Sequence, residues 1–562
     1  MAFSYATSLR MRRGALLFGT ALGMVTTTAH AQDTAAPAAA TPGGGQAGDT
    51  SAVSRSSASA ASARHVDINE YFVEGNTALG DPEIEEAVYP YLGPDKTLDD
   101  VEKARVALQK AYADKGLKTA FVEIPQQNVV GGRVRLVVTE AKIGQVAVTG
   151  EKHTSERRVL AALPEVQSGK VPDLNALTDQ ITALNSRSAD RQITPELKPG
   201  TVPGTIDVAL KVDDKLPLHG GVELSNRYSR DTTPLRLQAN LRYDDLWGLG
   251  HSISGFYSVA PQRRSDAEVF VGSYGAPLTD SLRLDVTGLR SNSDVATVGS
   301  TNVLGNGWSV SAALTKTLKG GPGFYHRLSV TLAYKDFKED TSFTDDKGAV
   351  GISKAPIRYV PISLSYAGSW VIGQGTLGFG LAGTFGLRAL GSDETAFDNK
   401  RYRAGGGFAY LHGNVDYLYT LPHDFQLYTN IEGQLASQPL ISNEEMSLGG
   451  VGTVRGYLQS EAIGDEGLLS SIELRSPSLG KFSGGLIDEL RLVAFADAGR
   501  VWVIDPLPDQ DSSIGLFSVG GGLRAKLLKR LSGDLDVGVP LKSNGATRSG
   551  DVRVQFRVSS DF

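Results

Sequence analysis

The sequence contains no cysteine in 562 residues. Disulfide scaffolds, thiol nucleophiles and cysteine-ligated zinc sites are therefore excluded. Long apolar runs are also missing, since none approaches the roughly 20 residues that a membrane-spanning helix needs. A helical membrane protein is excluded on the same ground.

Neither sign of charge is in large excess. Lys and Arg together number 56 and Asp and Glu 62, which gives a net charge of −6. A nucleic-acid-binding chain carries a basic surface, so we expect no nucleic-acid partner. A mean hydropathy of −0.14 leaves two classes open, a soluble multidomain protein and a membrane β-barrel, whose apolar residues are spread over short alternating segments.

The signatures of common enzymes are incomplete. The segment from Gly250 to Ser254 ends in Ser where a nucleophile elbow has Gly. The GxGxxG match that begins at Gly373 is followed by a strand pattern and not by a helix. The eight His form no HExxH pair. We therefore predict that the chain is not an enzyme and has no catalytic residues, no metal and no cofactor.

The first residues contain the three parts of a secretory signal peptide. Arg residues precede an apolar stretch, and Ala29-His30-Ala31 provides a small-x-small cleavage site. We expect residues 1–31 to be removed on export, which separates the mature chain from cytoplasmic nucleotides. Residues 32–64 are mostly Ala, Ser, Gly, Pro and Thr, and we predict a low-complexity linker with one weak helix.

Residues 65–215 show one pattern twice. Residues 65–141 read as strand, helix, helix, strand and strand, and residues 142–215 repeat that order with a period of roughly 75 residues. We predict two tandem α/β domains, each a small sheet with helices on one face. A single mixed α/β domain is the alternative.

Residues 216–562 lack a convincing amphipathic helix and alternate between apolar and polar positions. From Leu235 to Tyr243, for example, the odd positions are apolar and the even positions are polar or charged. About sixteen such segments can be placed, and the chain ends on the aromatic Phe562. Because lipid permits only closed sheets, we predict a sixteen-stranded antiparallel transmembrane β-barrel. A secreted β-solenoid would show a short repeat, and none is visible.

One predicted loop of the barrel, residues 437–468, is far longer than an ordinary hairpin connection. It contains Val454, Arg455, Gly456 and Tyr457 in a Gly-rich setting. If the loop folds back into the barrel lumen, Gly permits close backbone approach and the buried guanidinium needs a carboxylate. A mobile surface loop with a solvated Arg is the alternative.

A matching carboxylate lies on a later strand. From Leu490 onward, alternation places Arg491, Val493, Phe495 and Asp497 inside the barrel. Asp497 is then positioned to accept Arg455 in a bidentate pair that fixes the loop.

Three motifs together resemble those of a known family. They are Val454-Arg455-Gly456-Tyr457, Phe495-Ala496-Asp497-Ala498-Gly499, and the sequence RYDDLWGLGH at residues 242–251. With the α/β repeats, they resemble the outer-membrane transporters of two-partner secretion, the TpsB or ShlB/FhaC/HecB type. The resemblance covers about residues 65–562. It implies two periplasmic POTRA domains and a barrel in the outer membrane of a Gram-negative bacterium.

The resemblance also implies a function. Such transporters recognise an unfolded exoprotein, an adhesin or a cytolysin, through their POTRA domains and secrete it through the pore, without catalysis. The chain is expected to act as a monomer in outer-membrane lipid, with no nucleic acid and no nucleotide. An outer-membrane protein insertase of the same superfamily is the alternative, although it typically carries three or more POTRA domains. Family members often place a pore-plugging helix before the first POTRA domain, and here only the weak helix in residues 32–64 is available for that position.

Passenger binding by strand addition needs a free edge of a sheet. One predicted strand in each α/β domain is a candidate for that edge. The candidate residues are Ala120, Phe121, Val122, Glu123 and Ile124 in the first domain, and Gln192 and Ile193 in the second.

Overall fold

The computed structural model describes residues 65–186, 188–293, 296–298, 301–303, 305–338, 340–344, 350–482, 486–545 and 547–562. The predicted signal peptide and low-complexity linker lie outside these residues. The chain divides after Leu216 into two compact units. No helix within the described residues is long and apolar enough to span a membrane.

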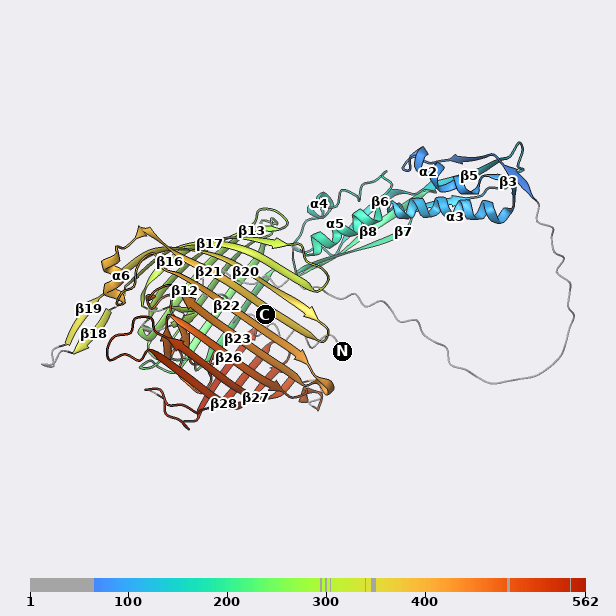
Figure 1. Ribbon diagram of the computed structural model, residues 1–562. Helices are drawn as coiled ribbons and strands as arrows, with labels where there is room; N and C mark the ends of the chain where they lie inside the picture. Colours follow the sequence, from blue (N-terminus) through green and yellow to red (C-terminus); the bar gives the residue numbers. More distant parts are fainter. Residues whose placement is uncertain are drawn as a thin grey trace, which may run out of the picture. The chain divides into compact units, whose positions relative to one another are not determined.

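The first α/β domain is a three-stranded sheet with helices on one face (Figure 1). The strand order is β2-β5-β4, in which β2 runs parallel to β5 and β4 antiparallel. Ala104, Leu108 and Tyr112 follow one another at four-residue spacing on helix α3, and all three are fully buried. The elements in order are β1 (Val66–Ile68), β2 (Glu70–Glu74), α2 (Asp81–Val88), η2 (Tyr89–Tyr91), β3 (Gly93–Lys96), α3 (Leu98–Asp114), β4 (Ala120–Glu123) and β5 (Arg133–Glu140).

The order differs from the predicted pattern in one detail. The sequence predicts a break at Gly93-Pro94, but β1 and β3 form an additional two-stranded sheet there. Its pairs are Val66 with Lys96 and Ile68 with Gly93. Pro94 lies between the paired positions, so its missing N–H removes no donor from this short ladder.

The second α/β domain repeats the arrangement, which confirms the predicted tandem pair. Its sheet has the order β6-β8-β7, with β6 parallel to β8. The connection between α4 and α5 contacts the first domain, since the Leu174 amide donates to the Gly116 carbonyl at 2.9 Å and Val171 packs on the first core. The elements are β6 (Lys142–Thr149), α4 (Glu156–Ala161), α5 (Leu174–Ser186), β7 (Arg191–Pro199) and β8 (Thr205–Asp214).

A glycine recurs at the same place in both domains, directly after the first strand of each main sheet. Gly75 has a φ of 88°, and a Cβ added there would lie 2.2 Å from the Val138 carbonyl oxygen. Gly150 has a φ of 89°, and its added Cβ would lie 2.3 Å from the Val212 carbonyl oxygen. Both the positive φ and the close approach require Gly, which gives the sequence repeat a physical basis.

A buried carboxylate ends the central strand of each domain and binds the turn that this glycine begins. Glu140 accepts hydrogen bonds from the amides of Thr77 and Ala78, both at 2.8 Å, and from the Tyr112 hydroxyl at 2.9 Å. In the second domain, Asp214 accepts from the amides of Lys152, His153 and Thr154 at 3.0, 2.6 and 2.6 Å. Burial alone would raise the pKa of the Glu140 and Asp214 carboxyls, but hydrogen bonds to the charged form outweigh it and hold each pKa below its usual value.

Sixteen antiparallel strands of the described residues close into a barrel, because the last strand pairs with the first (Figure 1). The predicted strand number and closure are confirmed. The strands are β9 (Leu218–Ser225), β10 (Arg236–Leu246), β11 (His251–Val259), β12 (Ala267–Pro277), β13 (Leu282–Ser293), β16 (Asn306–Leu318), β17 (Phe324–Lys338), β20 (Ile357–Ile372), β21 (Gly375–Gly391), β22 (Ala409–Thr420), β23 (Gln426–Ala436), β26 (Glu466–Arg475), β27 (Ile487–Trp502), β28 (Ser513–Leu527), β29 (Leu531–Pro540) and β30 (Arg553–Asp561).

The two ends of the barrel differ in their connections. We call the end where the chain enters at Pro217 and finishes at Phe562 the turn end, and the other the loop end. Connections at the loop end include the hairpins β14 (Ala296–Val298) with β15 (Thr301–Val303) and β18 (Asp340–Thr344) with β19 (Val350–Lys354), and the helix α6 (Glu394–Lys400). Those at the turn end are tighter, as between β20 and β21.

Side chains alternate between the two surfaces of the barrel. Outward leucines such as Leu241, Leu381 and Leu492 remain about half exposed, at 52, 49 and 52%, as expected of a surface that faces lipid. Many inward positions on β13, β16, β17, β20 and β21 carry small hydroxyl side chains. We call this set the hydroxyl wall; its buried members are Thr287, Ser291, Ser293, Ser309, Ser311, Ser329, Ser363, Ser365 and Thr384.

The motif at residues 242–251 builds the first connection at the turn end, between β10 and β11. The Asp245 side chain accepts a hydrogen bond from the Gly250 amide at 2.8 Å. Trp247 and Gly248 have φ angles of 56° and 66°, so the chain reverses through left-handed conformations. The motif therefore fixes the register in which the barrel begins.

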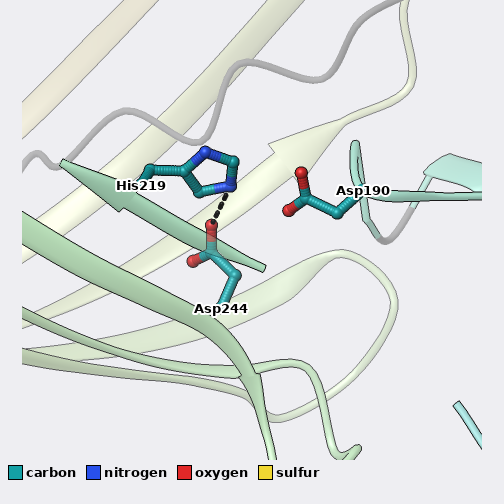
Figure 2. Close-up of side chains that lie close together, drawn as sticks. All are labelled: Asp190, His219 and Asp244. Carbon is teal, nitrogen blue, oxygen red and sulfur yellow. Dashed lines mark ion pairs between the residues drawn. The ribbon is translucent and has the colours of Figure 1, made fainter. Parts of the chain in front are cut away.

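His219 of β9 and Asp244 of β10 form an ion pair beside this turn (Figure 2). Their nearest nitrogen and oxygen atoms are 3.8 Å apart, and Arg242 Nε lies 2.9 Å from the same carboxylate. Because the guanidinium already neutralises the carboxylate, we interpret this pair as a link between the first two barrel strands.

Candidate functional site

A long connection at the loop end returns into the barrel lumen. We call residues 437–465, between β23 and β26, loop L6. It contains the short strands β24 (Met446–Leu448) and β25 (Ala462–Gly464), which pair with each other. The sequence predicts a loop up to residue 468, but Glu466 already pairs with Trp502 in the barrel wall. The first residues of β26 alternate in the same way as the rest of that strand, so they belong to the wall.

Two glycines shape the start of the L6 tip. Gly449 has a φ of 111°, and a Cβ added there would lie 2.3 Å from the Leu458 carbonyl oxygen. Gly450 has a φ of 95°, and its amide donates to the Val454 carbonyl at 3.1 Å. The tip is therefore a tight turn that presents the next residue, Arg455, to the wall.

Arg455 and Asp497 form the bidentate pair that alternation predicts. Arg455 Nε lies 2.7 Å from Asp497 Oδ2, and Arg455 Nη2 lies 2.8 Å from Asp497 Oδ1. The Arg455 amide donates to the same carboxylate at 3.1 Å. The side chains of Arg455 and Asp497 are 4% and 0% exposed, so the alternative of a solvated Arg on a surface loop is excluded.

The wall supplies further partners to the same guanidinium. Arg455 Nη1 donates to Glu473 of β26 at 2.7 Å, and Ser471 donates to Asp497 at 2.6 Å. The aromatic ring of Phe495 lies 3.5 Å from the guanidinium carbon, in cation–π geometry. All four wall residues point inward from two adjacent strands, β26 and β27.

The remaining motif residues fit the tip against the wall. Val454 and Tyr457 are fully buried, and the Tyr457 hydroxyl donates to the carbonyls of Phe517 and Lys542 at 3.1 and 2.6 Å. Gly456 has a φ of 90° and packs against Gly538 of β29. A Cβ added at Gly499 would lie 2.7 Å from the Leu448 side chain, so a larger residue there would displace L6.

The Arg455 pair is part of a larger network, which we call the charged wall and define as Glu473, Arg475, Asp497, Arg524 and Asp536. Arg475 Nε lies 2.7 Å from Glu473, and Arg524 Nη2 lies 2.8 Å from Asp536. Removing one partner from a buried ion pair leaves an uncompensated charge and costs about 3–5 kcal/mol. The network therefore holds L6 strongly while all of its members are present.

Sequence reasoning found Asp497 and missed Glu473. The signal was available, because Ser471, Glu473 and Arg475 occupy alternate positions on β26 and all face the lumen. Asp536 and Arg524 alternate in the same way on β29 and β28. What the sequence does not reveal is which of these inward charges the loop meets.

The candidate passenger strand of the first α/β domain, β4, lies at an edge of its sheet. Its outer backbone groups, however, already bond to helix α3. The Gln109 side chain donates to the Ala120 carbonyl at 2.6 Å and accepts from the Val122 amide at 2.9 Å. Arg105 donates to the Val122 carbonyl at 3.3 Å. The strand therefore has few groups left for another chain.

The two ends of the candidate segment behave differently. Phe121 and Glu123 point outward, and Phe121 is 60% exposed. Ile124, predicted as part of the strand, lies beyond its last residue and packs against the core of the domain. Ile124 is apolar and follows the exposed Glu123, so burial of its side chain decides its position.

The second candidate strand, β7, is also an edge strand with occupied backbone groups. The Asn185 side chain accepts from the Ile193 amide at 2.8 Å and donates to the Ile193 carbonyl at 3.0 Å. Ile193 itself is buried, whereas Gln192 is exposed. Pro195 and Pro199 remove two further donors, as is typical of edge strands that resist pairing.

Comparisons with known proteins agree with this architecture. The family model described as haemolysin secretion/activation protein ShlB/FhaC/HecB matches residues 204–525, and a model of the ShlB-type POTRA domain matches residues 66–141. The outer membrane transporter CdiB of Dickeya dadantii (strain 3937) is 23% identical over 509 residues, which cover 87% of this chain and 85% of the relative.

Solved structures share the fold. CdiB from Escherichia coli superposes with a TM-score of 0.58 at 19% identity, over 91% of this chain and 93% of that one. BamA from Haemophilus ducreyi, in a form lacking POTRA domains 1–3, superposes with a TM-score of 0.55 at 14% identity, over 88% and 100%. The family model covers more than half of the chain, including Arg455 and Asp497. The chain therefore belongs to the haemolysin secretion/activation protein family ShlB/FhaC/HecB, the outer-membrane transporters of two-partner secretion.

Proposed function

We propose that this chain binds an unfolded exported protein in the periplasm and passes it through its barrel to the cell surface. The observation that carries the proposal is the buried tip of L6, held by Arg455 inside a polar lumen. A barrel of sixteen strands is wide enough to leave an aqueous channel. A loop held inside that channel controls how much of it is open.

The hydroxyl wall supports passage of an unfolded chain. Ser363 and Thr384 bond to each other at 3.0 Å, as do Thr315 and Ser329 at 2.9 Å. Such side chains are polar and small, so a polypeptide that passes along them meets no strong apolar or ionic contacts. The charged wall, in contrast, is occupied by L6.

We propose strand addition as the mode of capture and assign it to edges other than the two predicted ones. Within the described residues, the outer backbone groups of residues 71–74 of β2 and 146–149 of β6 bond to no side chain or neighbouring loop. Both segments are sheet edges, and both precede the structural glycines. An extended passenger gains main-chain hydrogen bonds there without displacing Gln109 or Asn185.

Single-cysteine variants test these edges, because the native chain has no cysteine. We expect Phe72→Cys and Ala147→Cys, on β2 and β6, to cross-link to a passenger arrested during secretion. The matched controls Phe121→Cys and Thr194→Cys place the thiol on the exposed faces of β4 and β7. Stronger cross-linking from the control positions would return the site to the edges predicted from the sequence.

We further propose that the partner is a secreted exoprotein of the adhesin or cytolysin type and that the transporter acts as a monomer in outer-membrane lipid. The direct pairing of β30 with β9 supports the monomer, because the barrel closes without a second chain. Transport by binding and folding of the passenger needs no catalytic residue, cofactor or nucleotide.

Insertion of other barrels into the membrane is the second candidate function, since the fold resembles that of BamA. Two tandem POTRA domains and the family match favour secretion. Deleting the gene separates the two. We expect the loss of one large exported protein from the culture medium, with the outer-membrane proteins unchanged. A general decrease in outer-membrane barrels would instead support the insertase.

A further inference from the structure

L6 has a second buried contact with the barrel, at Glu444. The side chain of Glu444 is 1% exposed and forms an ion pair with Lys335 of β17, whose side chain is 9% exposed. Glu444 also accepts hydrogen bonds from the hydroxyls of Tyr359 on β20 and Tyr410 on β22, at 2.6 and 2.9 Å. The Glu444 carbonyl accepts from Gln434 of β23 at 3.1 Å. Four strands therefore hold this one residue.

The two contacts of L6 use different strands of the barrel wall. The tip reaches β30, where the Gly456 amide donates to Gln555 at 3.4 Å and Gln555 donates to the Tyr457 carbonyl at 3.3 Å. In the strand order, β17 and β30 are seven places apart by the shorter way around the ring of sixteen. The segment from Glu444 to Gly456 therefore joins two separate parts of the wall through the lumen.

An apolar cluster packs L6 against the barrel near Glu444. Leu440 and Ile441, in L6, are buried against Phe397 of α6 and Phe408, which precedes β22. Tyr359, whose hydroxyl binds Glu444, belongs to the same cluster. This side of L6 therefore packs on an apolar core of the barrel next to Glu444.

The two contacts differ in the number of interactions that hold them. Arg455 has two carboxylates, an aromatic ring and a backbone bond to Asp497, and its neighbours Gly456 and Tyr457 add further bonds. The Glu444 side chain has one cation and two phenols, and the Glu444 carbonyl accepts from Gln434. The Glu444 carboxylate thus depends on a single ion pair, whereas the Arg455 guanidinium pairs with two carboxylates.

We propose that Glu444 is a positioning residue for secretion, which keeps the pore closed by holding L6 against β17, β20 and β22. When Lys335, Tyr359 and Tyr410 release Glu444 while Arg455 stays bound, L6 moves toward the charged wall. A passage then opens between L6 and the hydroxyl wall, and the exported chain leaves by it. The inference extends the transport function and assigns no new substrate.

Charge reversal tests the pair in the full-length protein. We expect Lys335→Glu and Glu444→Lys each to raise the ionic current of the purified transporter in planar lipid bilayers. The double variant restores the ion pair with its signs exchanged and returns the current toward the native level. If Lys335 and Glu444 acted only through their separate effects on barrel stability, exchanging their charges would not restore the native current. Unchanged currents in both single variants, or a double variant as open as the singles, would overturn the proposal.

Two controls accompany this measurement. Lys526→Glu makes the same charge change on β28 near the turn end, and we expect native currents from it. Heat-modifiable migration in gels reports whether each barrel has assembled. For any charge variant that fails to assemble, Tyr359→Phe combined with Tyr410→Phe removes two hydrogen bonds without changing charge. This variant must also raise the current, or the proposal fails.

Reversible linkage then tests whether release is needed for secretion. The double variant Lys335→Cys with Glu444→Cys has only these two thiols, because the native chain has no cysteine. In cells, a reducible bifunctional linker joins them. We expect secretion to stop on linkage and to resume on reduction. Thr315→Cys with Ser329→Cys, joined in the same way across β16 and β17, leaves L6 free and secretion unchanged. Continued secretion with Glu444 linked would overturn the proposal.

Discussion

Both units of the molecule bury carboxylates, but different donors satisfy them. In the periplasmic domains, Glu140 and Asp214 bind backbone amides of a turn in their own domain. In the barrel, Asp497 and Glu473 bind a guanidinium carried by a loop. The donors of the first kind belong to the fold of the domain, whereas the main donor of the second kind is a side chain carried by a loop.

This difference in donors separates carboxylates that stabilise a domain from carboxylates that hold a loop. Backbone amides separate from Glu140 only when the turn after β2 unfolds, so this contact is part of domain stability. Separating Arg455 from Asp497 requires movement of L6 only and leaves the sixteen strands paired. We infer that the periplasmic carboxylates serve folding and that the barrel carboxylates serve a loop whose position matters for transport.

Replacing Arg455 tests the contact between L6 and the barrel carboxylates, and it has the largest expected effect. Arg455→Ala leaves Asp497 buried without its cation and takes one cation from Glu473, which costs about 3–5 kcal/mol in the attachment of L6. We expect secretion into the medium to be lost while the barrel still assembles, as shown by heat-modifiable migration. Arg500→Ala, which removes an outward Arg on β27, is the matched control. Normal secretion by Arg455→Ala would contradict the role of the tip.

A conservative replacement at the same position sharpens the comparison. Arg455→Lys keeps the charge but cannot form the two parallel bonds to Asp497 or stack in the same way on Phe495. We expect secretion between the native level and that of Arg455→Ala in the same assay. Full activity of the Lys variant would show that charge alone suffices.

Neutralising Glu140 tests the periplasmic side. Glu140→Gln weakens the bonds to Thr77 and Ala78 and leaves buried groups partly unsatisfied, at a cost of about 1–3 kcal/mol. We expect faster hydrogen exchange in the turn after β2, measured by mass spectrometry on the full chain, with barrel peptides unchanged. Glu123→Gln, on the exposed face of β4, makes the same chemical change and serves as the control. Equal exchange in both variants would show that Glu140 does not stabilise the turn.

Acid has the smallest expected effect and acts on both periplasmic carboxyls. Their folded pKa values lie below the usual value, so the stability that they contribute is complete above the unfolded pKa of about 4. It is lost as the pH falls through the folded pKa. We expect the turns after β2 and β6 to lose exchange protection below pH ~4, after correction for intrinsic rates. Loss of protection nearer neutral pH would point to another group.

Much of the fold follows from local patterns in the sequence. The alternation in residues 216–562 predicts the strand number and the inward position of Asp497, because side chains on a strand point to opposite faces in turn. The Gly-rich setting of Arg455 predicts close backbone approach if the loop enters the lumen, and it leaves a surface loop as the alternative. The same reasoning fails for Ile124, which leaves its strand, and for β1 and β3, whose pairing joins segments far apart in the chain.

The candidate site is only half visible in the sequence. Arg455 and Asp497 stand out through their motifs, but Glu444 carries no motif. Its partners Lys335, Tyr359 and Tyr410 come from three separate strands and meet it only because the barrel is closed. Likewise, alternation identifies β4 and β7 as strands, but the bonds from Gln109 and Asn185 that occupy their edges depend on how each helix packs on its sheet.

The sequence by itself determined the class of this protein, two α/β repeats followed by a sixteen-stranded barrel with one long Arg-bearing loop. The reason is that alternation and glycine placement are local patterns, and the order of elements repeats along the chain, so none of them depends on a contact with a distant residue. Only the tertiary structure decided where L6 lies, which charges hold it and which sheet edges stay open. These depend on contacts between residues far apart in the chain, which exist only after the barrel has closed and the helices have packed.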